Sequence, residues 1–291
     1  MHNSLMAWFK VAIKTSISGL ASWVLSSMVT VSNLALAYNP LNREEYLAKI
    51  KEAEAYYKDK CEKVAGIKIY KTVPDVEGVL LLKIRPERTD RELADPMWPG
   101  AAFGGEVYGN SYITSFLGYE YRGVNKEGVI SSERGYINTE RRPGGLPGYS
   151  WVEVPNPKDG QRYRYVLEFK EVTHTSSPLI GGDGKAFTVK ENVLTKTLSP
   201  SKTPPRYAVT FEDHVIPEER ALWLASSTVT VLDLKTNEVL GEMTRYAISY
   251  IHAPRNSMPW LNHYFCPVID GRAYQDTRHF VDQILIPKKE K

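Results

Sequence analysis

The spacing of hydrophobic residues changes along the chain, and the first clear pattern is helical. Between positions 42 and 66, apolar side chains recur every three or four residues, as on one face of an α-helix. Asn42 is a suitable N-cap with Glu45 three residues later, and Gly66 is a typical stop. We therefore predict a helix here. Its buried face is predicted to carry Tyr46, Ile50, Ala53, Tyr57, Cys61 and Val64.

From residue 67 onward the period becomes two, which is typical of half-buried strands. Alternation is most regular in 163–172, and 79–84 is a denser apolar run like that of a central strand. Residues 228–234 and 239–251 flank a four-residue turn and predict a β-hairpin. Further strands are predicted at 67–70, 112–121, 129–137, 150–154, 187–198 and 207–211.

The remaining segments are predicted loops and short helices. Glycine and proline crowd residues 95–109 and 141–148, which predicts two irregular loops. Pro217 opens a short helix, and a last helix is predicted over 278–285. Because strands do not alternate with helices, we predict a mainly β (α+β) fold. It is an antiparallel sheet assembly, sandwich- or barrel-like, with an N-terminal helix and a C-terminal helix.

Residues 1–37 have the features of a secretory signal peptide. Two lysines precede a mostly apolar run, 17–31, and an Ala-Leu-Ala motif ends at Ala37, so cleavage is predicted before Tyr38. A permanent membrane anchor is the alternative, which the serines within the run and the cleavage motif disfavour. Met6 is an alternative start to Met1. Residues 38–291 are then a single β-rich mature domain, which contacts a membrane only during export.

The composition excludes some function classes. Removing residues 1–37 takes two of the 37 lysines and arginines and none of the 34 acidic residues, so the net charge falls from +3 to +1. A nearly neutral chain is unsuited to nucleic-acid binding, which requires a basic surface. The chain also lacks an N-x-S/T glycosylation site. Together with the signal, this favours a bacterial protein of the periplasm or the extracellular space.

The two cysteines, Cys61 and Cys266, are predicted to form a disulfide, because the compartments that receive exported proteins are oxidising. The alternative is two unlinked buried thiols. His263 lies three residues before Cys266, so half of a zinc site and a Cys–His nucleophilic pair are further alternatives. A zinc site needs clustered ligands, and the sequence contains neither C-x-x-C nor H-E-x-x-H, so no metal is predicted.

Residue types for acid–base chemistry occur in the C-terminal third, where hydrogen bonding is the alternative role. No phosphate-binding or nucleophile-elbow motif is present, so no cofactor is predicted. The candidates are Asp213, His214, His252, His263, Asp270, Asp276, His279 and Asp282.

Aromatic residues crowd the region of the two predicted loops, where they suit a surface that stacks on a ligand. The alternative is that tyrosine simply fits half-buried β-structure. The predicted ligand surface comprises Trp98, Phe103, Tyr108, Tyr112, Tyr149 and Trp151.

These observations favour an exported, non-enzymatic protein that binds a protein, glycan or small molecule. One alternative is a secreted hydrolase that uses the His and Asp residues above. Another is a structural or assembly component of the cell envelope, which a long unpaired sheet edge would favour.

Overall fold

The computed structural model describes residues 43–177, 179, 181–249, 258–261, 263–269 and 275–289. The predicted signal peptide, its cleavage site at Ala37 and Tyr38, and Asn42 lie outside these residues. The chain divides into two compact units, residues 1–48 and 49–291. Only the beginning of one helix is described in the first unit. The features below belong to the second.

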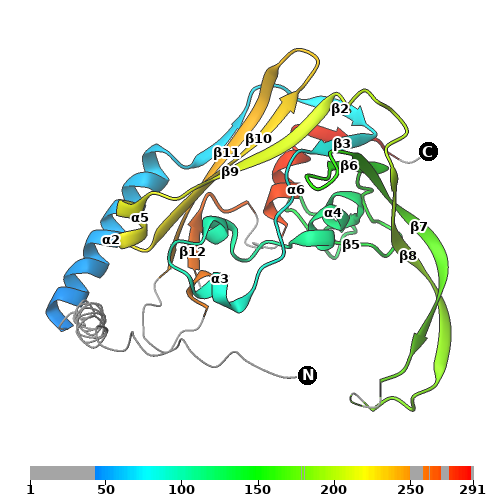
Figure 1. Cartoon of the computed structure of the whole chain (residues 1–291), viewed down its shortest axis with the longest axis horizontal. Coiled ribbons are helices and arrows are strands. Elements are labelled where there is room, and N and C mark those ends of the chain that lie inside the picture. The colour runs from blue at the N-terminus through cyan, green and yellow to red at the C-terminus, as the bar shows by residue number, and fades with distance from the viewer. Residues whose placement is uncertain are drawn as a thin grey trace, which may run out of the picture. The chain divides into compact units, whose positions relative to one another are not determined.

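Nine strands of the described residues form one sheet (Figure 1). Its order is β1-β11-β10-β9-β3-β6-β7-β8, with β12 also paired to β11. Neighbours are antiparallel except β3, which runs parallel to both β6 and β9. The strands are β1 (Gly66–Ile69), β3 (Gly78–Leu81), β6 (Trp151–Pro155), β7 (Arg162–Thr175), β8 (Ala186–Leu198), β9 (Tyr207–His214), β10 (Leu224–Asp233), β11 (Glu238–Ser249) and β12 (His263–Cys266).

The predicted fold class is confirmed. The chain is mainly β, with helix α2 (Arg43–Lys63) at the N-terminal side and α6 (Asp276–Val281) near the C-terminus, and the described strands do not close into a barrel. Two small sheets pair β2 (Val73–Val76) with β13 (Leu285–Pro287) and β4 (Tyr119–Tyr121) with β5 (Tyr136–Asn138). The other helices are α3 (Asp90–Ala94), η1 (Pro99–Phe103), α4 (Gly109–Leu117), α5 (Pro217–Ala221) and η3 (Pro259–Leu261).

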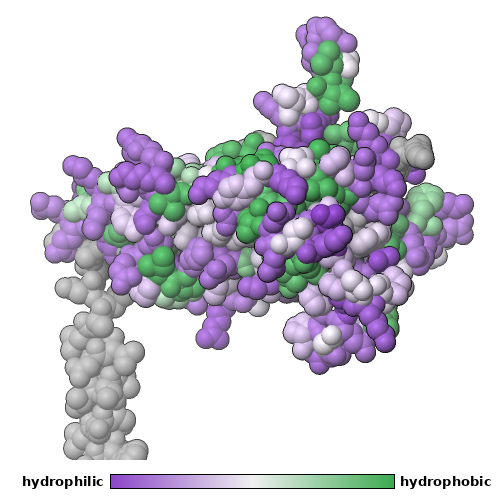
Figure 2. Space-filling view, turned by 90° about the horizontal axis from the view of Figure 1, so that it is seen from above, coloured by the Kyte–Doolittle hydropathy of each residue, from purple (hydrophilic) through white to green (hydrophobic). Residues whose placement is uncertain are grey.

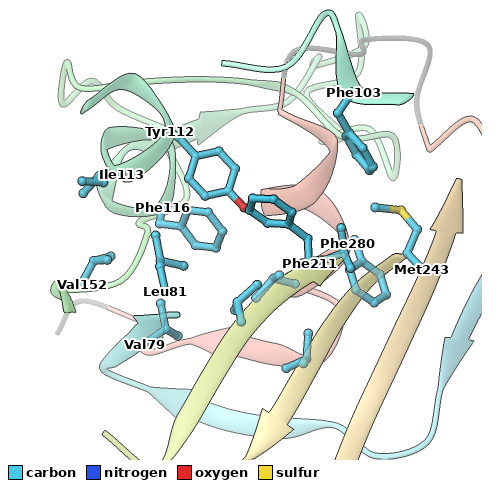
Figure 3. Close-up of a cluster of buried hydrophobic side chains, with 14 of the residues drawn as sticks. Val79, Leu81, Phe103, Tyr112, Ile113, Phe116, Val152, Phe211, Met243 and Phe280 are labelled. Atoms are coloured by element: carbon cyan, nitrogen blue, oxygen red, sulfur yellow. The ribbon is translucent and has the colours of Figure 1, made fainter. Parts of the chain in front are cut away.

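The main core lies on one face of the sheet. The alternation of β10 and β11 brings Val229 opposite Met243 and Ala225 opposite Ala247, and all four are buried. Figure 3 shows side chains from α4, α6 and several strands pointing into this interior. Phe116 and Phe280 are fully buried there. Burying side chains of this size contributes roughly 1.5–3 kcal/mol each.

The opposite face of β10 and β11 carries helix α2. Ala53 packs with Leu224, Tyr246 and Ile248 in a separate buried cluster. The helical stripe predicted from the sequence is therefore confirmed in its central part. Cys61 is half-buried, and the end of the stripe at Val64 is 46% exposed, so only the middle of the helix is buried against the sheet.

Several segments differ from the sequence prediction. The last helix, predicted over 278–285, is α6 and ends at Val281, and Leu285 already belongs to β13. Residues 112–121 are not one strand, because α4 occupies most of them and only β4 is extended. Within α4, Tyr112, Ile113, Phe116 and Leu117 have helical spacing and are all buried. The strand predicted at 129–137 is reduced to β5, and Val129 is 61% exposed. The predicted loop 95–109 contains η1, with three buried residues.

The predicted hairpin and the predicted strands 163–172 and 187–198 are all present. β10 and β11 are joined by a turn in which Asn237 has φ of 61°, a conformation that asparagine tolerates well. β7 and β8 pair from Tyr163–Leu198 to Thr175–Ala186 without a register shift. They extend away from β4 and β5 as a curved two-stranded arm (Figure 1).

Candidate functional site

The candidate site lies where β3 leaves the sheet. The backbone N–H of Leu82 still donates to Val209 O of β9, at 2.9 Å. Two residues further along β9, Phe211 O accepts from the side chain of Lys83, at 3.1 Å from Nζ. A longer β3 would have used a backbone amide for that bond. The lysine side chain therefore caps the exposed part of the β9 edge.

The local sequence explains why the strand stops. After the apolar run of β3, charged residues alternate with apolar ones at Lys83 and Arg85, and Pro86 lacks a backbone donor. Proline is unsuited to the middle of a sheet, and the exposed Lys83 side chain is unsuited to a buried central strand. The chain therefore turns away between β9 and β6, and a groove opens at this point.

This groove has a volume of about 930 Å³. That is within the range of ligand pockets, roughly 300–1,000 Å³. Its apolar lining comes from the departing segment, from β6, β7 and β9, and from the turn between β6 and β7. The principal apolar residues are Leu82, Ile84, Val154, Tyr165 and Phe211.

The charged groups of the groove are all cationic. Lys83, Lys158 and Lys196 line it together with uncharged residues, and none of the described lining residues is acidic. All three lysines are exposed, and in the described part of the chain none has a carboxylate within 4.0 Å of its ammonium. Lys196 Nζ lies 3.9 Å from the centre of the Tyr163 ring.

Asp159, in the turn beside the groove, is already engaged. Hydrogen bonds from the Gln161 backbone N–H, the Tyr163 hydroxyl and Asn156, with a smaller effect of the nearby Lys196 charge, lower the pKa of the Asp159 carboxyl. It does not line the groove. The arrangement can therefore hold a negative charge beside a large apolar surface.

The predicted aromatic surface is wrong for four of its six residues. Trp98, Phe103, Tyr112 and Tyr149 are 8%, 2%, 1% and 2% exposed, so their rings are part of the core. Tyr149 donates its hydroxyl hydrogen to Leu285 O at 2.6 Å, which ties the segment before β6 to β13. Crowding of aromatic residues near glycine- and proline-rich loops does not predict exposure here, because these loop segments and α4 pack against the core.

Tyr108 and Trp151 are half-buried in different places. Tyr108 comes together with Trp98 and Phe103 around a small pocket of about 160 Å³. The Trp151 ring lies over the backbone of Gly78, where an added Cβ would approach it to 2.2 Å. The Arg164 guanidinium lies 4.1 Å from the centre of that ring. The six residues thus do not form one site.

The disulfide is confirmed: Cys61 and Cys266 are bonded, with 5.8 Å between their Cα atoms. The bond removes the thiolate that a zinc site or a Cys–His nucleophile at Cys266 would need. His263 is half-buried, and burial together with the nearby Arg245 charge lowers its pKa to about 4. His263 and Cys266 are therefore the first and last residues of strand β12, and their H-x-x-C spacing follows from the strand and not from a zinc or nucleophile site.

The carboxylates considered for acid–base chemistry are paired with arginines. Asp213 accepts from Arg85 at 2.7 Å, Asp276 pairs with Arg245, and Asp282 accepts from both Arg278 and Arg134. His214 shares a hydrogen bond of 3.1 Å with Thr228 Oγ1. Within the described residues, no three His, Cys, Asp or Glu side chains form a metal-binding group. His252 and Asp270 lie outside the described residues.

Exposed hydrophobic residues and an unpaired strand edge lie outside the groove. Figure 2 shows hydrophobic residues gathered in several patches between hydrophilic ones on the face seen from above. On the hairpin arm, Phe169 is 66% and Phe187 49% exposed. No described strand pairs with the outer edge of β8, which is 13 residues long and contains no proline.

Comparison of the chain with family models, with curated proteins and with solved structures finds no match. None of the described helices is long and apolar enough to cross a membrane. The groove residues were not predicted from the sequence. A signal for them exists at the sequence KIRPER, where a buried strand pattern is interrupted by charges and a proline.

Proposed function

We propose that this protein is a non-enzymatic binding protein for an anionic amphiphile, a molecule with an extended apolar body and a carboxylate or phosphate head. The ligand would occupy the lysine-lined groove. The observation that carries this proposal is the combination of an apolar groove of about 930 Å³ with three exposed lysines and no acidic lining residue among those described.

The energetics favour such a ligand over a neutral one. Each methylene buried in the groove contributes roughly 0.8 kcal/mol, so affinity comes mainly from the apolar body. Each exposed lysine adds roughly 0.2–1 kcal/mol for a negative head. The lysines therefore supply selectivity for charge more than total affinity, and that selectivity falls with ionic strength.

An extended peptide is a less suitable occupant. A peptide would gain most from adding a strand to the free part of the β9 edge. There, Lys83 Nζ already donates to Phe211 O, and Arg85 pairs with Asp213 two residues further along. A cationic cap on an edge disfavours strand addition and leaves the ammonium groups suited to an anion.

The site of action proposed is outside the bacterial cytoplasm, in the periplasm or the extracellular space. The disulfide is consistent with an oxidising compartment. Export through a signal peptide cleaved after Ala37 remains part of the proposal. A hydrolase is less favoured, because Asp213, Asp276 and Asp282 are all engaged with arginines.

Isothermal titration calorimetry with dodecanoate, dodecyl phosphate, dodecanol and dodecyltrimethylammonium tests the proposal. We expect the two anions to bind, the alcohol to bind more weakly and the cation to bind least. The dodecanoate and dodecyl phosphate arms distinguish a carboxylate head from a phosphate head. Saturable binding of an acidic peptide without binding of either anion would overturn the proposal.

The test variant carries both Lys158→Gln and Lys196→Gln. The control variant carries Lys202→Gln, which changes an exposed lysine outside the groove. Loss of two exposed charge contacts should weaken dodecanoate binding roughly twofold to thirtyfold and leave dodecanol unchanged. Lys202→Gln should have no effect. Equal weakening of dodecanol would mean that the lysines act through structure and not through charge.

The free edge of β8 favours a second candidate function, assembly in the cell envelope by strand addition. A regular, 13-residue edge without proline is a template for another strand. A photo-crosslinking amino acid placed at the exposed Phe187 should give one discrete larger adduct in intact cells. If neither a crosslinker at Phe187 nor one at Phe169 gave an adduct, the result would count against this function.

A further inference from the structure

A second, smaller pocket lies beside the groove, and Pro86 borders both. We call it the arginine pocket. Its volume is about 160 Å³. Its charged residues are Arg85, Arg88, Glu92 and Asp213, and its rings are Trp98, Phe103 and Tyr108.

The aromatic walls of the arginine pocket are positioned by η1 and by the start of α4. Trp98 precedes η1, and its ring lies against Gly100, where an added Cβ would approach it to 2.5 Å. Tyr108 precedes α4. Phe103, at the end of η1, is held between two buried guanidinium groups, those of Arg85 and Arg245, at 4.3 and 4.2 Å from its ring centre. The rings are therefore ordered before any ligand enters.

Three of the four charged side chains already have partners. Arg85 donates to Asp213 at 2.7 Å, so these two opposite charges neutralise each other. Glu92 accepts hydrogen bonds from the backbone N–H and the hydroxyl of Thr89, in the capping box that begins α3. Asp213 is engaged with Arg85, whereas Glu92 keeps its negative charge but is held by Thr89 and forms no ion pair with Arg88.

Arg88 is the remaining cation. Its guanidinium donates to the backbone carbonyl of Glu106 at 2.6 Å and lies 4.4 Å from the centre of the Tyr108 ring. Of the described carboxylates, none lies within 4.0 Å of it. Burial lowers the pKa of Arg88, which means that its charge is incompletely solvated. The charges of Tyr108 and Glu106 oppose this shift from beyond ion-pair distance. A half-buried charge without a direct counter-ion is costly, and an anion in the pocket would lower that cost.

We propose that the arginine pocket binds a small aromatic carboxylate. The carboxylate pairs with Arg88, whose planar donors match two oxygens, and the aromatic ring fits among Trp98, Phe103 and Tyr108. The size agrees, because a cavity of about 150 Å³ holds one benzene ring. This proposal concerns a different pocket from the amphiphile groove and does not depend on it.

Calorimetric titration with benzoate, benzyl alcohol and benzylammonium tests this inference on the unmodified full chain. Benzoate should bind saturably, benzyl alcohol more weakly, and benzylammonium least. The expected loss from benzoate to benzyl alcohol is about tenfold to a hundredfold, the size of one charge-assisted contact. Benzyl alcohol binding as tightly as benzoate, or no saturable benzoate binding, would overturn the proposal.

Arg88→Gln should lower benzoate affinity by a similar factor. Arg91, in α3, is exposed and serves as the control, so Arg91→Gln should leave benzoate affinity unchanged. Circular dichroism verifies that each variant is folded. The ligand series on the unmodified protein decides the question even where Arg88→Gln loses stability. Lys158→Gln with Lys196→Gln should leave benzoate binding unchanged. A parallel loss there would show that benzoate occupies the groove and would overturn the proposal.

Discussion

Breaking the disulfide should lower the free energy of unfolding by several kcal/mol without unfolding the native protein. Cys61 and Cys266 are 205 residues apart in the sequence, so the bond closes a loop of most of the described chain. For a loop of that length, the chain-entropy relation gives about 5 kcal/mol at 25 °C. Measured losses are typically about 2–5 kcal/mol. A domain of ordinary stability has about 5–15 kcal/mol in total.

The fold should survive at ambient temperature because α2 has other contacts with the sheet. Ala53 stays buried against Leu224 and Ile248, and Lys60 pairs with Glu219 at 3.5 Å. These contacts do not depend on the bond between the sulfur atoms. Reduction should therefore act mainly on the unfolded state, which gains conformational freedom.

Urea unfolding followed by circular dichroism measures this effect with and without a phosphine reductant. The unfolding midpoint should fall on reduction, and the slope should rise because the unlinked chain exposes more surface. The variant Cys61→Ser with Cys266→Ser is the control, since its midpoint should match the reduced protein and ignore the reductant. An unchanged midpoint after complete reduction would refute the entropic reasoning.

Three further results are expected. Phe116→Ala should lower the free energy of unfolding in urea by about 3–5 kcal/mol, because the ring is fully buried. Phe169→Ala removes a ring that is 66% exposed and should change it by less than about 0.5 kcal/mol. Equal losses would contradict the assignment of Phe116 to the core. Burial raises the pKa of Glu106 from 4.5 to about 7, so its contribution to stability is greatest below pH 4.5 and is lost as pH rises through 7. Glu106→Gln should flatten that decline, and an unchanged pH profile would exclude this role. Mass spectrometry of exported protein should find Tyr38 at the N-terminus, and a retained residue 1 would refute cleavage.

Local patterns were sufficient for the elements whose neighbours are close in sequence. The β10–β11 hairpin, the strands β7 and β8, and helix α2 all follow from periodicity over a short stretch of sequence. Residues 112–121 were misassigned because tyrosine and isoleucine favour strands, while the helical spacing of Tyr112, Phe116 and their neighbours was the stronger signal. Propensity was overridden by burial on one helical face.

The groove could not be predicted because it depends on strands far apart in the sequence. It exists where β3 departs from between β6 and β9, and no periodicity within residues 78–86 specifies those neighbours. The disulfide was predictable for a different reason. Only two cysteines were present, and the compartment inferred from residues 1–37 favours oxidation, so the pairing required no knowledge of the topology.

The interior explains why the groove and the arginine pocket occur side by side. Arg85 is stacked between Phe211 and Phe103, at 3.8 and 4.3 Å from the ring centres, so one buried cation orients a ring that lines the groove and a ring that lines the pocket. An apolar side chain in place of a buried ion pair is often no less stable, so the Arg85–Asp213 pair is not required for stability alone. The pair does orient its neighbours, however, because the Arg85 guanidinium contacts both rings and also donates to Asp213. A core built this way gives up some apolar burial for defined ring positions, which is the property that a preformed binding site requires.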